Sequence, residues 1–312
     1  MHIGAGKLDV VERRQLAVDA VELTLRRPDL GRLSDWTPGA HVALTLPNGM
    51  VRPYSLCGDR WDPCTYTVAV RRDVDGTGGS AYLHDVLRVG DVVGVGTPRN
   101  SFPLVPATSY VFVAGGIGIT PFLPMIQAAA GLDIPFRLLY IGRDIASMPY
   151  VDDLLTGPRA EHVEVHTTSD HGRPDLAEAV GPLTDGARVY ACGPADMSDV
   201  LEDLARSWPD YTLRTEAFAR PKALETDEPF TAELRRTGAT ITVPRRTSLL
   251  EAIQTAGVDI LSSCRAGSCG ACETPVLHGE VDHRDTILAD GDVGVMFPCV
   301  SRAREGLVVL DL

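Results

Sequence analysis

The nine-residue stretch Cys264-Arg-Ala-Gly-Ser-Cys269-Gly-Ala-Cys272 carries the strongest signal in the chain, and Cys299 follows it after a long gap. Four thiolates can complete the tetrahedral sulfur shells of two iron atoms that share two bridging sulfides. The glycines and small residues between the cysteines would let backbone N–H groups approach those sulfurs closely. The sequence therefore predicts a metal centre with the ligands Cys264, Cys269, Cys272 and Cys299.

The spacing C-x4-C-x2-C with one distant cysteine is the plant-type [2Fe–2S] pattern. The alternatives are a structural zinc site and a set of unrelated core cysteines, but zinc sites usually combine two closely spaced pairs. His278 and His283 lie in the gap before Cys299. A Rieske centre would need histidines to replace two cysteines, and four cysteines are already present, so we interpret these histidines as surface residues.

The residues around the motif predict a small α+β domain over 230–312. The alternation over 230–243, with Gly238 in the turn, indicates a hairpin. An amphipathic helix over 247–256 and a strand over 307–310 complete the expected elements. A polar tract that ends at Pro229 has the composition of a linker, which we place at residues 221–229.

Upstream of the linker, residues 105–220 alternate apolar runs of strand length with helical stretches, the clearest of them over 195–208, which predicts a parallel sheet in an α/β domain. The loop AGGIGITP, residues 114–121, follows the first of these strands. It departs from G-x-G-x-x-G, but Gly116 and Gly118 would let a pyrophosphate approach a helix N-terminus. Cys192-Gly193-Pro194 ends a later strand, where ligands of parallel sheets bind; the alternative for Cys192 is a small core residue.

The first 104 residues show period-two patterns and turn signals, which predict an antiparallel β-barrel. At the end of one strand, RPYSLC (residues 52–57) suits a flavin: Arg52 a phosphate, Tyr54 the ring face and Ser55 the N5 edge. The alternative is an ordinary strand with a buried tyrosine. The segment GTGGS, residues 76–80, opens a short helix over 80–87 with Ser80 as its N-cap, and its glycines would wrap a phosphate.

Composition limits the remaining function classes. The 312 residues are 44% hydrophobic and 23% charged, with a net charge of −13, so nucleic-acid binding is disfavoured. Between Arg99 and Asp133 no charge occurs, but the prolines and glycines there would break a membrane-spanning helix. The charged N-terminus is unlike a signal peptide, and clustered cysteines suit a reducing compartment, so we expect a monomeric cytoplasmic protein without membrane association.

Taken together and in this order, the motifs resemble the phthalate dioxygenase reductase family, which includes vanillate demethylase reductase subunits. The resemblance covers essentially the whole chain; its most specific parts are RPYSLC, VAVRRDVDGTGGS, AGGIGITP, ACGP, EAF and CRAGSCGAC. It implies a multi-domain protein: an antiparallel β-barrel that binds FMN (1–104), an α/β parallel-sheet domain that binds NADH (105–220), and a β-grasp ferredoxin domain with a [2Fe–2S] cluster (230–312). The implied partner is an oxygenase component.

The resemblance also implies roles for single residues. The implied FMN contacts are Arg52, Tyr54, Ser55, Ala69, Val70, Arg71, Gly78, Gly79, Ser80, Thr120 and Phe218. The implied NAD contacts are Gly116, Gly118, Arg143, Cys192, Gly193 and Pro194, with Glu216 near the nicotinamide. Thr120 would touch both cofactors, and Phe218 would cover the flavin face; the alternatives for Phe218 and Glu216 are core packing and a surface carboxylate.

The expected activity is electron transfer: hydride from NADH to FMN, then single electrons to the cluster and to a Rieske-type oxygenase, with a cytochrome P450 as the alternative acceptor. A second hypothesis is a relay or redox-sensing subunit without NADH turnover. FMN is favoured over FAD because the Gly-Gly-Ser phosphate site suggests that the cofactor ends there, whereas FAD would need room for its adenosine. NADPH stays open because Arg143 could meet a 2′-phosphate, although Asp144 would repel it. The pattern gives no role to Cys57 or Cys64, and His162 and His166, four apart on a strand, do not converge on a metal.

Overall fold

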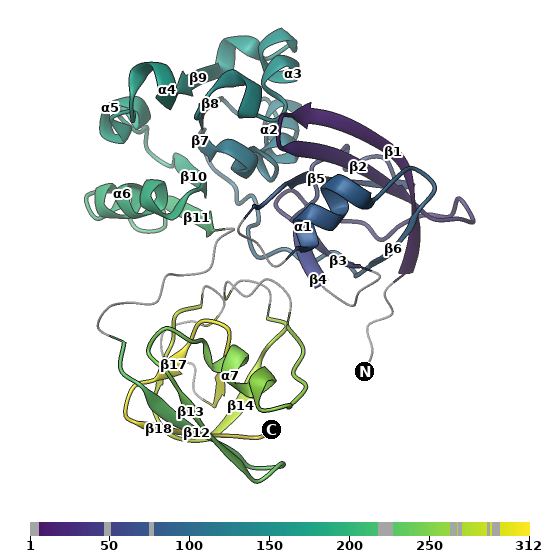
Figure 1. The fold of residues 1–312 in the computed structure, drawn as a ribbon. Coiled ribbons are helices and arrows are strands. Elements are labelled where there is room, and N and C mark those ends of the chain that lie inside the picture. The colour runs from purple at the N-terminus through teal and green to yellow at the C-terminus, as the bar shows by residue number, and fades with distance from the viewer. Residues whose placement is uncertain are drawn as a thin grey trace. The chain divides into compact units, whose positions relative to one another are not determined.

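The computed structural model divides the chain into two compact units, residues 1–218 and 219–312. It describes residues 6–46, 51–74, 78–217, 227–262, 267, 270–285, 288 and 294–312. Figure 1 shows the elements of both units. The first unit contains both the predicted barrel and the predicted parallel sheet.

A six-stranded antiparallel sheet with the order β4-β3-β6-β1-β2-β5 opens the first unit. Its strands are β1 (Gly6–Ala17), β2 (Ala20–Arg26), β3 (His41–Thr45), β4 (Val51–Ser55), β5 (Thr65–Arg71) and β6 (Val92–Val95). The two outer strands meet through a bridge between Leu56 and Val68, which closes the sheet into a barrel. Alternate apolar residues such as Leu23, Val42 and Val68 fill its core. The predicted barrel is confirmed.

The short helix of the barrel differs from the sequence prediction. Helix α1 (Gly79–Ala81) begins after Gly78, which has φ +93°, and continues into a π-turn, η1 (Tyr82–Val86). Ser80 is therefore not the N-cap. Its hydroxyl instead accepts a hydrogen bond from the Asp73 backbone N–H, at 3.0 Å. The prediction was wrong because the left-handed turn at Gly78 starts the helix before any side-chain cap is reached.

The second sheet is parallel, with the order β11-β10-β7-β8-β9. Its strands are β7 (Tyr110–Gly115), β8 (Phe136–Gly142), β9 (Val163–Thr167), β10 (Arg188–Gly193) and β11 (Leu213–Ala217). The connecting helices are η2 (Gly116–Ile119), α2 (Phe122–Gly131), η3 (Ile145–Ser147), α3 (Val151–Thr156), η4 (Ala160–His162), α4 (Thr168–His171), α5 (Leu176–Val180) and α6 (Ala195–Ala205). The predicted α/β architecture is confirmed.

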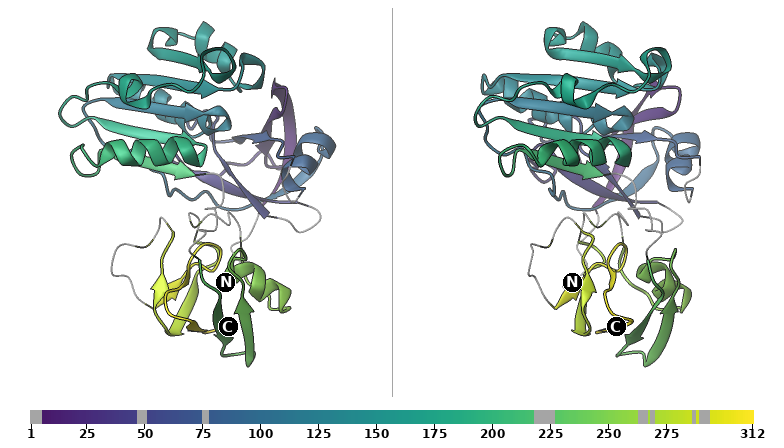
Figure 2. Two further views of the ribbon diagram at one scale, coloured as in Figure 1. Left: turned by 60° about the vertical axis from the view of Figure 1, so that its left-hand side comes forward. Right: turned by 90° about the vertical axis from the view of Figure 1, so that its left-hand side faces the viewer.

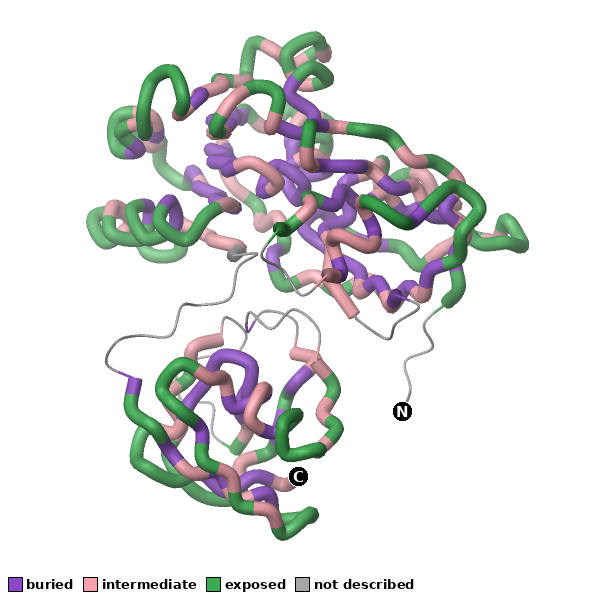
Figure 3. The backbone as a smooth tube through the Cα atoms, viewed as in Figure 1, coloured by how far each residue is buried: buried purple, intermediate pink, exposed green. Residues whose placement is uncertain are grey.

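Alternate residues of β7 pack into two hydrophobic clusters, because successive side chains of a strand face opposite sides. Phe112 and Ala114 pack with Phe122 of α2, whereas Val111 and Val113 pack with Leu201 of α6. Helices therefore cover both faces of the sheet, as Figure 2 shows. The tube in Figure 3 is buried along these central strands, which explains their nearly continuous apolar sequence.

The second unit is built on a mixed sheet with the order β13-β12-β18-β14-β16, in which β12 and β18 run parallel. Its elements are β12 (Phe230–Leu234), β13 (Ala239–Val243), α7 (Leu249–Thr255), β14 (Thr274–His278), β15 (Val281–Asp282), β16 (Val295–Met296), β17 (Arg302–Ala303) and β18 (Leu307–Leu310). The predicted hairpin and the C-terminal strand are confirmed. Helix α7 starts at a capping box formed by Ser248 and Glu251.

The packing of the second unit reaches back into the predicted linker. Asp227 is buried, and its carboxylate accepts a hydrogen bond from Arg284, at 2.7 Å. Arg302 is also buried and donates to the carbonyls of Thr247, Glu228 and Pro244. Residues 221–226 lie outside the described residues.

Candidate functional site

The predicted phosphate-binding residues of the barrel lie together. A Cβ placed on Gly79 would lie 3.1 Å from both Cγ and Nε of Arg52, so the Arg52 side chain passes directly over this glycine. Gly78, with φ +93°, turns the chain here. Because the Ser80 oxygen accepts the hydrogen bond from Asp73, its hydroxyl proton can be donated to an acceptor such as a phosphate oxygen. A guanidinium beside a glycine turn and a hydroxyl fits a phosphate group.

The two faces of β4 and β5 point to different parts of the unit. Tyr54 packs against the barrel core, and burial raises the pKa of its hydroxyl, so the side chain is neutral. Val70 also belongs to the barrel core, so only its backbone could contact a ligand on the opposite face. Cys57 and Ala69 instead pack in the cluster that contains Ile119 and Phe122 of the parallel-sheet part. Alternation puts Ser55, which is buried, on the same side as Cys57.

This shared side is where the two predicted cofactor sites meet. Arg71 lies two residues after Ala69, and its Nη1 is 3.8 Å from the position that a Cβ on Gly116 would take. Arg71 also forms an ion pair with Asp19, at 3.2 Å. Thr120 is buried at the same junction, and its hydroxyl donates to the Ile117 carbonyl, at 3.0 Å. The structure thus brings the barrel strand β5 beside the AGGIGITP loop.

The loops after β7 and β10 are packed backbone against backbone. A Cβ on Gly118 would lie 2.1 Å from the Cys192 carbonyl oxygen and 3.0 Å from the Gly193 nitrogen. A Cβ on Gly115 would lie 2.5 Å from Cδ of Pro194. Only glycine fits this approach, and it leaves the carboxyl ends of two adjacent parallel strands close together. Ligands of such sheets bind at this edge.

Cys192 is fully buried on β10, which lies between β7 and β11. Its register partners on those strands are Ala114 and Glu216. Burial, and then the nearby Glu216 carboxylate, raise the pKa of its thiol, so it stays protonated. A protonated thiol is compatible with both the predicted role beside a nicotinamide and the alternative of a small core residue. The structure places Glu216 at the same strand end as Cys192 and Gly193.

Arg143, which directly follows β8, is largely exposed and forms an ion pair with Asp144, at 2.9 Å. The Asp144 carboxylate also accepts from the Ser147 N–H and caps η3. The Arg143 guanidinium beside Asp144 holds the pKa of that carboxyl below its usual value, so it is ionised. If a nucleotide binds beside it, this carboxylate would repel a 2′-phosphate and could accept a hydrogen bond from a ribose hydroxyl.

In the second unit, the structure describes two of the four predicted ligands. Cys272 and Cys299 pack in one cluster with Leu250, Phe297 and Val300. A Cβ on Gly267, which has φ +73°, would lie 2.7 Å from Cγ2 of Val300 and 2.9 Å from Cα of Asp285. Gly267 therefore brings the cysteine-rich loop against the neighbour of Cys299, which fits a cluster held by both segments. Cys264, Cys269 and Phe218 lie outside the described residues.

His162 and His166, which the sequence analysis did not assign to a metal, make ordinary contacts. Nε2 of His166 lies 2.8 Å from the Gly172 carbonyl, and the His162 ring packs on Phe136.

A cavity of about 470 Å³ in the barrel is lined by Trp36, Arg60 and Arg99 among others, and none of the predicted cofactor residues lines it. In the described ranges, no helix is both long and apolar enough to cross a membrane.

Comparison with known proteins decides the family. Residues 232–304 match a 2Fe-2S iron-sulfur cluster binding domain. The phthalate dioxygenase reductase of Burkholderia cepacia is 38% identical over 315 residues, which cover 98% of this chain and 97% of that reductase. The chain belongs to the phthalate dioxygenase reductase family. It is therefore an oxidoreductase of the electron-transfer type that serves oxygenases.

Solved structures agree with this assignment. A phthalate dioxygenase reductase, described as a modular structure for electron transfer from pyridine nucleotides to [2Fe–2S], is 36% identical and has a TM-score of 0.76. The match covers 99% of this reductase and 98% of that chain. An intact type IV self-sufficient cytochrome P450 monooxygenase is 36% identical with a TM-score of 0.81; this reductase spans 41% of its length.

Sequence reasoning missed a group of residues between the two halves of the first unit. Tyr140 contacts the Gly116 carbonyl of the AGGIGITP loop and the Pro149 carbonyl, and the next residue, Tyr150, contacts Cys57 of RPYSLC and Glu22 of β2. No local motif marks these residues, because they come from three distant segments and two of them look like ordinary strand positions.

Proposed function

We propose that this reductase binds FMN through the barrel (1–104), NADH through the α/β part (105–220) and a [2Fe–2S] cluster through the ferredoxin part (230–312). The linker is predicted at 221–229, although Asp227 within it packs into the second unit. The observation that carries the proposal is the junction of Arg71 with Gly116. It brings the strand of the predicted flavin site beside the loop of the predicted nicotinamide site. When bound, the cofactors would supply the redox chemistry: hydride transfer from NADH to the flavin, followed by passage of the two electrons one at a time to the cluster.

For FMN, Arg52 and the turn of Gly78, Gly79 and Ser80 hold the phosphate. Tyr54 supports the ring from the barrel side, and Ser55 offers a hydroxyl at the junction. Ala69 and Arg71 border the ring from β5, whereas Val70 contributes only backbone because its side chain lies in the barrel core. Thr120 would border it from the other half. The role proposed for Phe218, which lies outside the described residues, is to cover the flavin face. We favour FMN over FAD because the phosphate would be bound by the turn of Gly78, Gly79 and Ser80 within the barrel, and FAD would need further room for its adenosine.

For NADH, Gly116 and Gly118 let the pyrophosphate approach the loop after β7. Cys192, Gly193 and Pro194 form the floor of the nicotinamide pocket, and the neutral, buried Cys192 thiol keeps that floor uncharged. Glu216 lies on the adjacent strand end. Arg143 orients Asp144, whose carboxylate accepts from a ribose hydroxyl and disfavours NADPH. The cluster is held by Cys264, Cys269, Cys272 and Cys299.

We propose a Rieske-type oxygenase as the electron acceptor. We also propose that this reductase is a monomer and acts in the cytoplasm. Support comes from the near end-to-end similarity to a reductase named for a dioxygenase. The similarity to a self-sufficient P450 favours a cytochrome P450 as the second candidate. A relay subunit without its own NADH turnover is disfavoured, because both features proposed for NADH binding are present: the AGGIGITP loop after β7 and the Cys192–Pro194 segment at the end of β10.

Steady-state oxidation of NADH with ferricyanide or cytochrome c separates a turnover enzyme from a relay subunit, since only the former consumes NADH rapidly. The acceptor class is tested by stopped-flow mixing of the NADH-reduced protein with the Burkholderia phthalate dioxygenase oxygenase or with a soluble P450. We expect reduction of the Rieske centre to be at least about tenfold faster. Preferential reduction of the P450 haem would refute the Rieske assignment and leave the NADH chemistry intact.

A further inference from the structure

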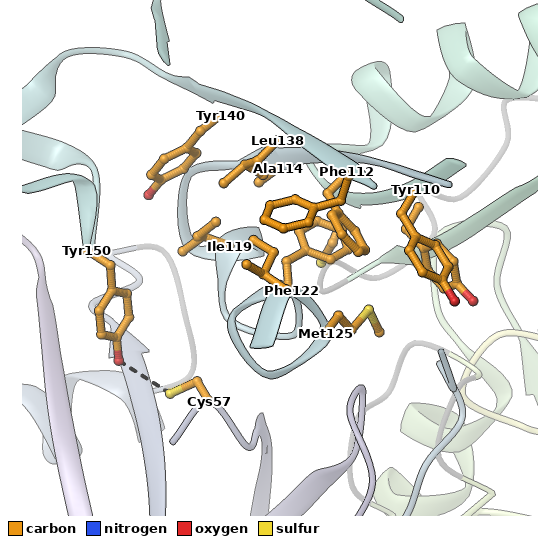
Figure 4. Packing of buried hydrophobic residues seen from close by; sticks show 14 of the residues in the cluster. Cys57, Tyr110, Phe112, Ala114, Ile119, Phe122, Met125, Leu138, Tyr140 and Tyr150 are labelled. Atoms are coloured by element: carbon orange, nitrogen blue, oxygen red, sulfur yellow. Dashed lines mark hydrogen bonds between the residues drawn. The ribbon is translucent and has the colours of Figure 1, made fainter. Parts of the chain in front are cut away.

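Two buried tyrosines join the halves of the first unit next to the predicted cofactor junction. The Tyr150 hydroxyl donates to Oε2 of Glu22 on β2, at 2.7 Å, and lies 3.3 Å from Sγ of Cys57 (Figure 4). Tyr150 is only 7% exposed, and its backbone has φ +62°, a left-handed conformation that costs about 1 kcal/mol or more for a bulky residue. Such strain persists only where the surrounding contacts enforce it.

The proton positions in this contact can be assigned. Tyr150 has one hydroxyl proton, and the Glu22 carboxylate takes it. The thiol of Cys57 must therefore donate to the Tyr150 oxygen, with the Thr67 carbonyl as a second acceptor at 3.5 Å. Burial raises the pKa of Cys57 to about 12, so the thiol keeps the proton that it donates. Cys57 thereby receives a role that the sequence did not indicate.

The outer side of the contact is also fixed. Arg14 on β1 pairs with Glu22, at 3.1 Å, and with Asp153 of α3, at 2.9 Å. Its guanidinium also lies over the Tyr150 ring, 5.6 Å from the centroid. Barrel strands and the segment around α3 are thus tied together by one ion-pair and hydrogen-bond network.

Tyr140 carries the connection onward to the nicotinamide loop. It is fully buried on β8, and its hydroxyl lies 2.8 Å from the Pro149 carbonyl and 3.1 Å from the Gly116 carbonyl. Pro149 directly precedes Tyr150, and Gly116 begins η2 of the AGGIGITP loop. An unbroken chain of contacts therefore runs from Gly116 through Tyr140 and Tyr150 to Cys57, two residues after Ser55 of the flavin motif.

We propose that Tyr140 and Tyr150 are positioning residues that set the distance between the nicotinamide loop and the flavin strand, and so the rate of hydride transfer. The inference rests on the proposed function. Both tyrosines act through other residues: Tyr140 through the Gly116 carbonyl, Tyr150 through Cys57. A hydride moves efficiently only in a narrow range of donor–acceptor distances, and a misplacement of ~1 Å can cost about a hundredfold in rate.

The test uses the full-length holoprotein with Tyr150→Phe, Tyr140→Phe and the control Tyr66→Phe. Tyr66 is also a buried barrel tyrosine, and its hydroxyl donates to the Ser34 carbonyl at 2.6 Å, outside this network. Anaerobic stopped-flow mixing with saturating NADH gives the limiting rate of flavin reduction and the long-wavelength charge-transfer absorbance between nicotinamide and flavin. Photoreduction without NADH gives the rate of electron passage to the cluster as an independent readout.

We expect the two network variants to retain FMN, to lose about tenfold in the limiting rate and to lose charge-transfer absorbance, with photoreduction of the cluster unchanged. Tyr66→Phe should keep all three properties. Cys57→Ala, which removes only the contact between Tyr150 and the RPYSLC strand, is the second variant should a tyrosine variant fail to accumulate, and the same losses are expected.

Flavin reduction within twofold of wild type in the network variants would overturn the inference. An equal slowing in Tyr66→Phe would do the same, because it would show a general effect of lost tyrosine hydroxyls. Failure of NADH to reduce the wild-type flavin would instead count against the proposed function, so the two failures are distinguishable.

Discussion

The substitution Gly118→Ala probes the backbone contact that brings the two strand ends together. The new Cβ would lie 2.1 Å from the Cys192 carbonyl oxygen, about 0.9 Å closer than the 3.0 Å below which such contacts essentially never occur. The opposing atoms are backbone atoms of a fully buried strand residue, so no side-chain rotation can relieve the clash. Gly118 does not have a positive φ, so the effect is steric rather than conformational.

Overpacking of this kind costs about 1–3 kcal/mol, which lowers the Tm of a unit of this size by roughly 3–10 °C. A loop shifted by close to 1 Å should also slow flavin reduction by NADH by between about tenfold and a hundredfold. Thermal release of the flavin, followed by its fluorescence, measures the first effect, and anaerobic stopped-flow absorbance measures the second.

Gly131→Ala is the matched control, because a Cβ at the end of α2 meets no atom within 4 Å. It should leave the Tm within about 2 °C of wild type or raise it slightly, since alanine favours a helix. A Gly118→Ala protein that matches this control in both Tm and flavin reduction would show that the two strand ends are not packed as described.

Three further outcomes are expected. Arg52→Ala should weaken FMN binding roughly 10- to 100-fold in a fluorescence titration, since a charge-assisted hydrogen bond contributes about 1.5–3 kcal/mol. The control is Arg32→Ala, which replaces an exposed arginine outside the site and should leave FMN affinity unchanged. Equal FMN affinities of the two variants would show that Arg52 does not bind the phosphate. Gly267→Ala should lower the iron content of the purified protein, because the new Cβ would clash with Val300. The control Gly257→Ala, also at a positive φ but with no atom within 4 Å of the new Cβ, should keep the wild-type iron content. Unchanged iron content in both variants would contradict the predicted approach of the loop to Cys299. At about pH 8, Cys57 and Cys192 should resist alkylation while the partly exposed Cys64 reacts. Burial raises the pKa of Cys57 to about 12 and that of Cys192 well above its ordinary value, so both thiols stay protonated. Rapid modification of either thiol, read by mass spectrometry, would contradict their burial.

The sequence predicted elements well where one periodicity dominates. The strand over 307–310 and the hairpin over 230–243 follow a clear alternation, and the structure has them at β18, β12 and β13. The predicted helix over 195–208 ends at Ala205 in the structure, three residues earlier. Helix ends are set by local hydrogen bonding rather than by periodicity, so they are predicted less well.

The site was predictable only where residues carry a local signal. Glycine clusters and cysteine spacing marked both loops, and the structure shows why Gly118 and Gly267 have no room for a side chain. The orientation of Val70 into the barrel core was not predicted, because a motif names consecutive residues while a strand turns alternate ones away. The Tyr140–Tyr150 network depends on tertiary contacts between residues more than a hundred positions apart, such as Glu22 and Tyr150, which no local pattern encodes.

The central claim is that NADH alone delivers electrons through the flavin to a binuclear iron cluster in the same chain. An anaerobic NADH titration followed by low-temperature EPR spectroscopy tests it directly. We expect a signal of about one reduced [2Fe–2S] centre per chain, held by Cys264, Cys269, Cys272 and Cys299. A flavin that bleaches with NADH while dithionite alone produces the cluster signal, or a protein that contains zinc in place of iron, would contradict it.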